Sequence, residues 1–158
     1  MLHDSACPIS PPPALRLLFL LARLKLSKLQ EHEANALCSR IEDWTELTCL
    51  AQDTFVLPLV YHHLSRLSPP SLPQNQMAQL RSQCLMSVAQ NLGIAAEQKR
   101  LVHELLVPLD VPYLFFKGPA LAARYYDDPG MRSCGDIDLL IPRSRMPDLL
   151  AEALQSGY

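Results

Sequence analysis

The chain has 158 residues, enough for one ordinary domain or for one domain preceded by a helical region. Its 14 Lys and Arg and 16 Asp and Glu leave a formal charge of −2, which argues against a polybasic membrane contact and makes nucleic acid an unlikely partner without excluding it. A composition that is 49% hydrophobic and 19% charged is typical of a globular protein and excludes general disorder.

The cysteines and the most apolar segment indicate the cellular compartment and whether the protein associates with a membrane. The five cysteines are widely spaced and form no C-x-x-C pair, which disfavours a disulfide framework or a zinc ribbon and suits a reducing compartment. Residues 14–26 carry three cations and are too short to cross a bilayer, and nothing basic precedes Arg16 as a signal peptide requires. We therefore expect a cytoplasmic protein with no membrane partner.

The N-terminal two-thirds of the chain is expected to be helical. Residues 1–13 end in three prolines and predict a disordered tail, and residues 14–107 predict a helical region. A break near Ser27 or Gln30 separates the first helix of this region from the second. The apolar positions expected to form the face of the first helix are Leu15, Leu18, Phe19, Ala22, Leu26 and Leu29.

Three further helices complete this region. Asp43 and Glu46 have the spacing of a capping box and predict the start of a helix. The next helix is expected over about 55–67, with Pro58 in its first turn, where proline is tolerated. The proline-rich residues 68–73 predict a linker, and residues 74–107 predict one long helix.

Residues 108–158 show a different pattern, in which short strands are expected to alternate with helices. Short apolar runs bounded by prolines alternate there with helical stretches. The expected elements are a buried strand over 111–116, a brief helix over 119–126, a second strand over 136–141, and a last helix capped by Ser144 and ended by Gly157. The predicted fold class is therefore α/β (α+β), with a helical N-terminal region followed by a small sheet.

Asp136 and Asp138 are the residues with the most evident chemistry. Side chains alternate along a strand, so two aspartates separated by one residue point the same way and repel each other. A divalent cation would relieve that repulsion, and Mg²⁺ prefers such oxygen ligands. Taken alone, the pair also fits a solvated strand end.

A glycine turn and an arginine lie near these aspartates in the sequence. Gly118 would let a ligand approach the backbone, and the helix that begins beside it would attract phosphate at its N-terminus. Lys117 and Arg132 are candidate phosphate contacts, although each also fits a surface position. Cys134 is expected to be a semi-buried residue and not a nucleophile.

Together these residues resemble the uncharacterised nucleotidyltransferase family of the DNA polymerase β superfamily. The resemblance covers about 43–158, and its most specific part is 117–141. It implies that residues 108–158 are the start of a nucleotidyltransferase catalytic core. The residues that carry the resemblance are Phe116-Lys117-Gly118, Leu121-Ala122, Tyr125-Tyr126, Asp128-Pro129-Gly130, Arg132 and Gly135-Asp136-Ile137-Asp138-Leu139-Leu140-Ile141. It implies transfer of NMP from an NTP to a hydroxyl group, with Asp136 and Asp138 as ligands of Mg²⁺ (two ions in the complete enzyme) and Gly118 against the nucleotide phosphates.

Two departures from the superfamily pattern leave alternatives open. Gly118 is followed by Pro119, where the superfamily usually has Ser or Gly, and a third carboxylate would normally come from a later strand. The chain therefore resembles the N-terminal part of a longer, truncated enzyme. The alternatives are a noncatalytic remnant of the same fold and a helical interaction module. The acceptor, the base of the NTP and the oligomeric state are not predicted.

Overall fold

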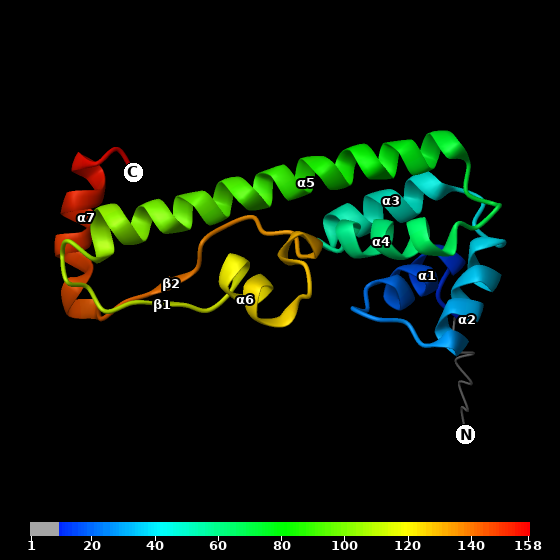
Figure 1. Ribbon diagram of the computed structural model, residues 1–158, viewed down its shortest axis with the longest axis horizontal. Coiled ribbons are helices and arrows are strands. Elements are labelled where there is room, and N and C mark those ends of the chain that lie inside the picture. The colour runs from blue at the N-terminus through cyan, green and yellow to red at the C-terminus, as the bar shows by residue number, and fades with distance from the viewer. Residues whose placement is uncertain (1–9) are drawn as a thin grey trace, which may run out of the picture.

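A long helix runs through the molecule and connects its two halves. The computed structural model describes residues 10–158, so most of the expected tail, residues 1–9, lies outside the described residues. Figure 1 shows an elongated molecule in which α5 (Gln74–Leu101) extends from a cluster of short helices to the C-terminal helix α7 (Met146–Gln155). Among the described residues, no helix has both the length and the apolar character that a membrane span needs.

The short helices form where the sequence supplies capping residues. Their bounds are Pro13–Leu21 for α1, Lys28–Cys38 for α2, Trp44–Asp53 for α3 and Leu57–Leu67 for α4. Ser27 begins α2 with a complete capping box, in which Ser27 and Gln30 each bond the other's backbone N–H. Asp43 caps α3 by accepting from Thr45 N at 2.8 Å. The structure gives no corresponding bond from Glu46, so only half of the expected capping box forms there.

The first helix is shorter than its apolar pattern predicts. It ends at Leu21, and the chain turns before Ser27 begins the next helix. The expected face is also wrong in part, because Phe19 is 64% exposed and Leu29 is 84% exposed. The turn explains the exposure of Leu29, which lies beyond it, whereas Phe19 lies within α1 on another face than the buried Leu17 and Leu21. The fully buried side chains of α1 are those of Leu17 and Leu21.

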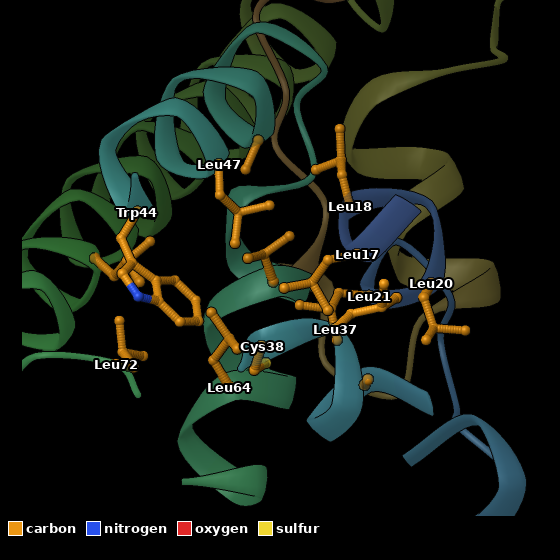
Figure 2. Packing of buried hydrophobic residues seen from close by; sticks show 14 of the residues in the cluster. Leu17, Leu18, Leu20, Leu21, Leu37, Cys38, Trp44, Leu47, Leu64 and Leu72 are labelled. Atoms are coloured by element: carbon orange, nitrogen blue, oxygen red, sulfur yellow. The ribbon is translucent and has the colours of Figure 1, made fainter. Parts of the chain in front are cut away.

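The core of the helical region draws on all four short helices and on the start of α5. Figure 2 shows Leu17, Leu37, Leu47 and Leu64 converging from α1, α2, α3 and α4. The linker over 68–73, which is neither helix nor strand, is fastened to this core. Trp44 Nε1 donates to the Ser71 carbonyl at 3.1 Å, and Leu72 is buried within the cluster. The region is thus a bundle that holds one end of α5.

The far end of α5 enters a second, smaller core. The helix continues into a π-helical turn, Val102–Leu106, so the predicted long helix is confirmed with a change of pitch near its end. Leu105 and Leu106 are fully buried against Val111 and against Leu149 of α7. Because Leu80 belongs to the first core and Leu105 to the second, the long helix fixes the two cores relative to each other.

The strands are much shorter than expected. β1 (Leu114–Phe115) pairs antiparallel with β2 (Leu139–Leu140), with Leu114 opposite Leu140. The same register puts Pro112 opposite Pro142, and neither proline has an N–H to extend the ladder. The expected burial of the first strand is also wrong, because the side chains of Leu114 and Phe116 are exposed. The molecule is therefore mostly helical with a small antiparallel sheet, which is compatible with an α+β fold.

Two elements between the strands and one after them complete the fold. Helix α6 (Gly118–Tyr125) follows β1, and a 3₁₀ turn, η2 (Pro129–Met131), precedes the aspartates. Ser144 does not cap α7, because it lies inside another 3₁₀ turn, η3 (Arg143–Arg145), that leads into the helix. Gly157 has a φ of +83° just after α7, as expected for the residue that ends a helix.

Candidate functional site

The five residues singled out in the sequence all line one cleft of about 370 Å³. They are Lys117, Gly118, Arg132, Asp136 and Asp138. The facing wall comes from the helical region and is contributed by Thr54, Phe55, Val56 and Leu59. The cleft thus lies where the helical bundle meets the C-terminal third of the chain.

Gly118 brings the two sequence segments of the cleft into contact. Continued beyond β1 and β2, the strand register puts Gly118 opposite Asp136. Gly118 is buried with a φ of +54°, and a Cβ placed on it would lie 3.0 Å from the Asp136 carbonyl oxygen. Only glycine combines that backbone conformation with so close an approach. The turn therefore holds the start of α6 against the aspartate segment.

The two aspartates precede the strand instead of lying within it. Asp136 is exposed, whereas the Asp138 side chain is 23% exposed and forms an ion pair with Lys117 across 3.6 Å. The Asp138 Oδ2 atom is buried and has no hydrogen-bond partner. This oxygen is the atom that Lys117 approaches, but 3.6 Å is too long for a hydrogen bond, so it can still bind a donor or a cation.

Arg132 places a buried hydrogen-bond donor in the same cleft. Its Nε is buried without an acceptor. Lys117 and Arg132 balance the formal charges of Asp136 and Asp138, so these four side chains together carry no net charge. One cleft therefore contains both a carboxylate oxygen without a donor and a guanidinium nitrogen without an acceptor.

A buried asparagine on α5 holds the backbone next to Arg132. Asn91 Nδ2 donates to the Arg132 carbonyl at 2.8 Å, and Cys134 N donates to Asn91 Oδ1 at 2.9 Å. Beside this pair, the Ser87 and Ser133 hydroxyls lie 2.9 Å apart. Asn91 stands at helical spacing among apolar residues of the helix predicted over 74–107, and no role was predicted for it. A polar residue within such an apolar stripe is the signal that could have revealed it.

Cys134 lines the cleft without the properties of a nucleophile. Burial is the main cause that raises the pKa of its thiol, and Asp136 adds to the effect while Arg132 opposes it. The thiol therefore stays protonated at neutral pH, and a protonated thiol is a weak nucleophile. Cys134 is 8% exposed and so is more buried than the semi-buried residue that was expected.

The two adjacent histidines lie outside this cleft and have structural surroundings. His63 is buried and its Nε2 is 2.8 Å from the Arg23 carbonyl oxygen. Burial first, and then the charges of His63 and Arg66, lower the pKa of His62. The part of the chain that the structure describes contains no group of three or more His, Cys, Asp or Glu side chains that could hold a metal ion.

The two aspartates nevertheless have the donor chemistry that Mg²⁺ requires. Mg²⁺ is commonly held by one or two carboxylates, with water and phosphate oxygens in its other positions. Asp136 and Asp138 supply such carboxylates, and the interaction that competes for Asp138 Oδ2 is its 3.6 Å ion pair with Lys117, not a hydrogen bond. A magnesium ion accompanied by a phosphate ligand therefore fits the residues present.

Comparison with known proteins assigns the chain to a family. Neither the curated proteins nor the solved structures gave a match. A family model described as "Uncharacterised nucleotidyltransferase" matches residues 41–158, which is more than half of the chain and includes every residue of the cleft. The chain therefore belongs to this uncharacterised nucleotidyltransferase family.

Proposed function

We propose that the protein is a Mg²⁺-dependent nucleotidyltransferase that transfers NMP from an NTP to a hydroxyl group of an acceptor. Its family membership supports the reaction class. The observation that carries the proposal is the pair of unsatisfied buried atoms, Asp138 Oδ2 and Arg132 Nε, in one cleft. A cation bound to a phosphate anion satisfies both atoms at once.

The charges of the cleft explain why binding would need the metal. The two carboxylates and two cations cancel, so the cleft alone has little attraction for a triphosphate. With Mg²⁺ held by Asp136 and Asp138, the four side chains and the ion together carry a net positive charge. The polyphosphate of an NTP then meets a complementary site, and we expect nucleotide and metal to bind together.

The aspartates, Lys117 and Gly118 have distinct roles in this proposal. Asp136 and Asp138 hold the metal, and Lys117 can exchange its ion pair with Asp138 for a phosphate oxygen. Helix α6 has no side-chain cap, so its first backbone N–H groups are free to bind phosphate, except at Pro119, which has none. Gly118 allows the phosphates to approach that helix end.

The proposed reaction is an in-line substitution at the α-phosphorus of the NTP. The acceptor oxygen forms a bond to the α-phosphorus, the bond from this phosphorus to the pyrophosphate oxygen breaks, and the hydroxyl proton leaves to solvent. Bound Mg²⁺ supplies activation of the attacking hydroxyl and stabilisation of the leaving pyrophosphate. Lys117 and Arg132 hold the phosphates in line for that attack.

One observation favours a narrower second function, which is nucleotide binding without transfer. Within residues 10–158, no third acidic side chain joins the two aspartates in a metal-binding group. A site with two carboxylates can hold a metal–nucleotide complex without completing the transfer. Release of pyrophosphate in the presence of hydroxyl acceptors separates the two functions, since only transfer produces it.

Calorimetry with ATP, GTP, CTP and UTP tests the proposed site. The wild type should bind NTP with Mg²⁺ and lose most of that binding in EDTA. Asp136→Asn and Asp138→Asn should each weaken Mg²⁺-dependent binding at least about tenfold, because each removes an anionic ligand. Asp148→Asn, an equal charge change at an exposed position on α7, is the matched control. Equal binding by the wild type and both site variants would reject the proposal.

A further inference from the structure

Phe55 has an unusual backbone conformation at the edge of the cleft. It comes directly after Thr54, the C-cap residue of α3, and has a φ of +59°, a value that is an outlier for a bulky side chain. Phe55 N donates to the Gln52 carbonyl and Val56 N donates to the Ala51 carbonyl, both at 3.0 Å. These two bonds form a Schellman motif, in which the residue with positive φ is most often glycine.

Packing does not explain why a phenylalanine occupies this position. The Phe55 side chain is 61% exposed, so it gains little from the helical core. In the described chain, the other non-glycine residues with positive φ are Ser68 and Asp110, which have short polar side chains. Phe55 is thus the exception, with an exposed aromatic ring in a position that a smaller residue would fill at lower strain.

The position of Phe55 in the cleft suggests a function in ligand binding for its aromatic ring. Phe55 lines the same cleft as Lys117, Gly118 and the two aspartates, but from the wall formed by the helical region. A nucleotide with its phosphates near Gly118 has its base some distance away within the cleft. Aromatic side chains stack on bases of every kind, because every base has a π-face.

We propose that Phe55 is the platform on which the base of the bound NTP stacks. This inference rests on the nucleotide site proposed above and adds the subsite for the base. The helical region thereby becomes part of the substrate site, since the end of α3 supplies its aromatic wall.

The other residues of that wall indicate how the base is recognised. Val56 and Leu59 are apolar, and the Thr54 hydroxyl already donates to the Leu50 carbonyl at 2.6 Å. This wall therefore offers stacking without a free side-chain donor to read the edge of a base. We expect the four common NTPs to bind within about tenfold of one another, with the larger purines ahead of the pyrimidines.

Substitutions at Phe55 separate base stacking from phosphate binding. Calorimetry on the full chain with Mg²⁺ would compare ATP with inorganic triphosphate, which has no base. Phe55→Gly should weaken ATP binding about tenfold and leave triphosphate binding unchanged. Phe55→Leu keeps an apolar side chain without a π-face and should show a similar loss, whereas Phe55→Trp should retain the affinity for ATP.

Thermal unfolding supplies the structural control. Glycine relieves the strain of a positive φ, so Phe55→Gly should keep or raise the Tm while it weakens ATP binding. Ser68→Gly makes the same backbone change at the end of α4, and Ser68 does not line this cleft. It should also keep or raise the Tm but leave ATP binding unchanged. A loss of affinity without a loss of stability cannot come from unfolding.

Each outcome supports or overturns the inference. Unchanged ATP binding in Phe55→Gly, or an equal loss of ATP and triphosphate binding, would overturn base stacking while leaving the proposed function intact. A wild type that binds neither ligand would overturn the proposed function and this inference with it. Phe55→Trp adds a direct signal, because its emission should be quenched by ATP and not by triphosphate, over the constant emission of the buried Trp44.

Discussion

Gly118 is the residue on which the geometry of the cleft depends most directly. Its positive φ turns the chain from β1 into α6, and the absence of a Cβ lets the Asp136 carbonyl approach. The contact between Gly118 and the Asp136 carbonyl needs both properties. A Cβ at this position would therefore strain the backbone and also press on that carbonyl. From the sequence, we expect a ligand to approach the backbone at Gly118, and the structure shows a second backbone segment in close approach there.

Gly118→Ala should therefore damage both stability and nucleotide binding. We expect the free energy of unfolding to fall by about 1–2 kcal/mol from the backbone conformation alone, and further because the new Cβ would press on the Asp136 carbonyl at 3.0 Å. Binding of Mg²⁺–NTP should weaken as the aspartate segment is pushed away. Urea denaturation and calorimetry measure the two effects.

Gly93→Ala is the control for this substitution. Gly93 lies within α5, and a Cβ there would meet nothing within 4 Å. Alanine should stabilise the helix by up to about 1 kcal/mol and leave nucleotide binding unchanged. If both alanine variants bound Mg²⁺–NTP as the wild type does, the close approach at Gly118 would have no part in the site.

At the scale of elements, α5 does more than connect two cores. Through Asn91 it holds the backbone over 132–134 by two hydrogen bonds, one from each end of the side-chain amide. That backbone leads directly to the aspartates and carries Arg132 into the cleft. The helix therefore acts on the site as a positioning element, although Asn91 itself does not line the cleft.

Asn91→Ala should loosen this backbone segment. It leaves the Cys134 N–H and the Arg132 carbonyl without their partners, and we expect a loss of about 1–3 kcal/mol in stability. Amide hydrogen exchange at Cys134 should become much faster. Gln79→Ala, at an exposed position on the same helix, should leave that exchange unchanged. An equally slow Cys134 amide in the Asn91 variant would contradict the assigned role.

The sequence predicted the elements well where local signals were strong. Helices α3, α4 and α5 begin close to the expected residues, because Asp43, Pro58 and the proline-rich linker fix where each can start. The expected break near Ser27 coincides with a capping box. The end of the first helix was wrong because leucines continue at helical spacing beyond Leu21, and periodicity alone does not show where a chain turns.

The strands were predicted less well than the helices, because their length depends on pairing between distant segments and not on the local apolar pattern. Apolar runs predicted two strands of six residues each. The observed register puts Pro112 opposite Pro142, which limits pairing at one end, and at the other end residues 136–138 lie outside β2. That register is a property of two segments far apart in the sequence. The same long-range geometry explains why the facing wall of the cleft, with Phe55, was not predicted as part of the site.

At the scale of the whole molecule, the cleft belongs to neither core alone. The helical bundle contributes the wall that contains Phe55, and the C-terminal third contributes the charged residues. Figure 1 shows α5 running beside both parts, with α6 below its middle. A nucleotide in the cleft would contact both parts, so we expect binding to stabilise the molecule as a unit.

The proposed site requires that Asp136 and Asp138 hold a metal ion together with a nucleotide beside Gly118. NMR of the ¹⁵N-labelled protein with Mn²⁺, a paramagnetic substitute for Mg²⁺, locates that ion directly. With ATP present, we predict the strongest line broadening at the amides of Gly118 and of residues 136–138, and its loss in Asp138→Asn. Broadening centred elsewhere, for example at His62 and His63, or unchanged by Asp138→Asn, would contradict the claim.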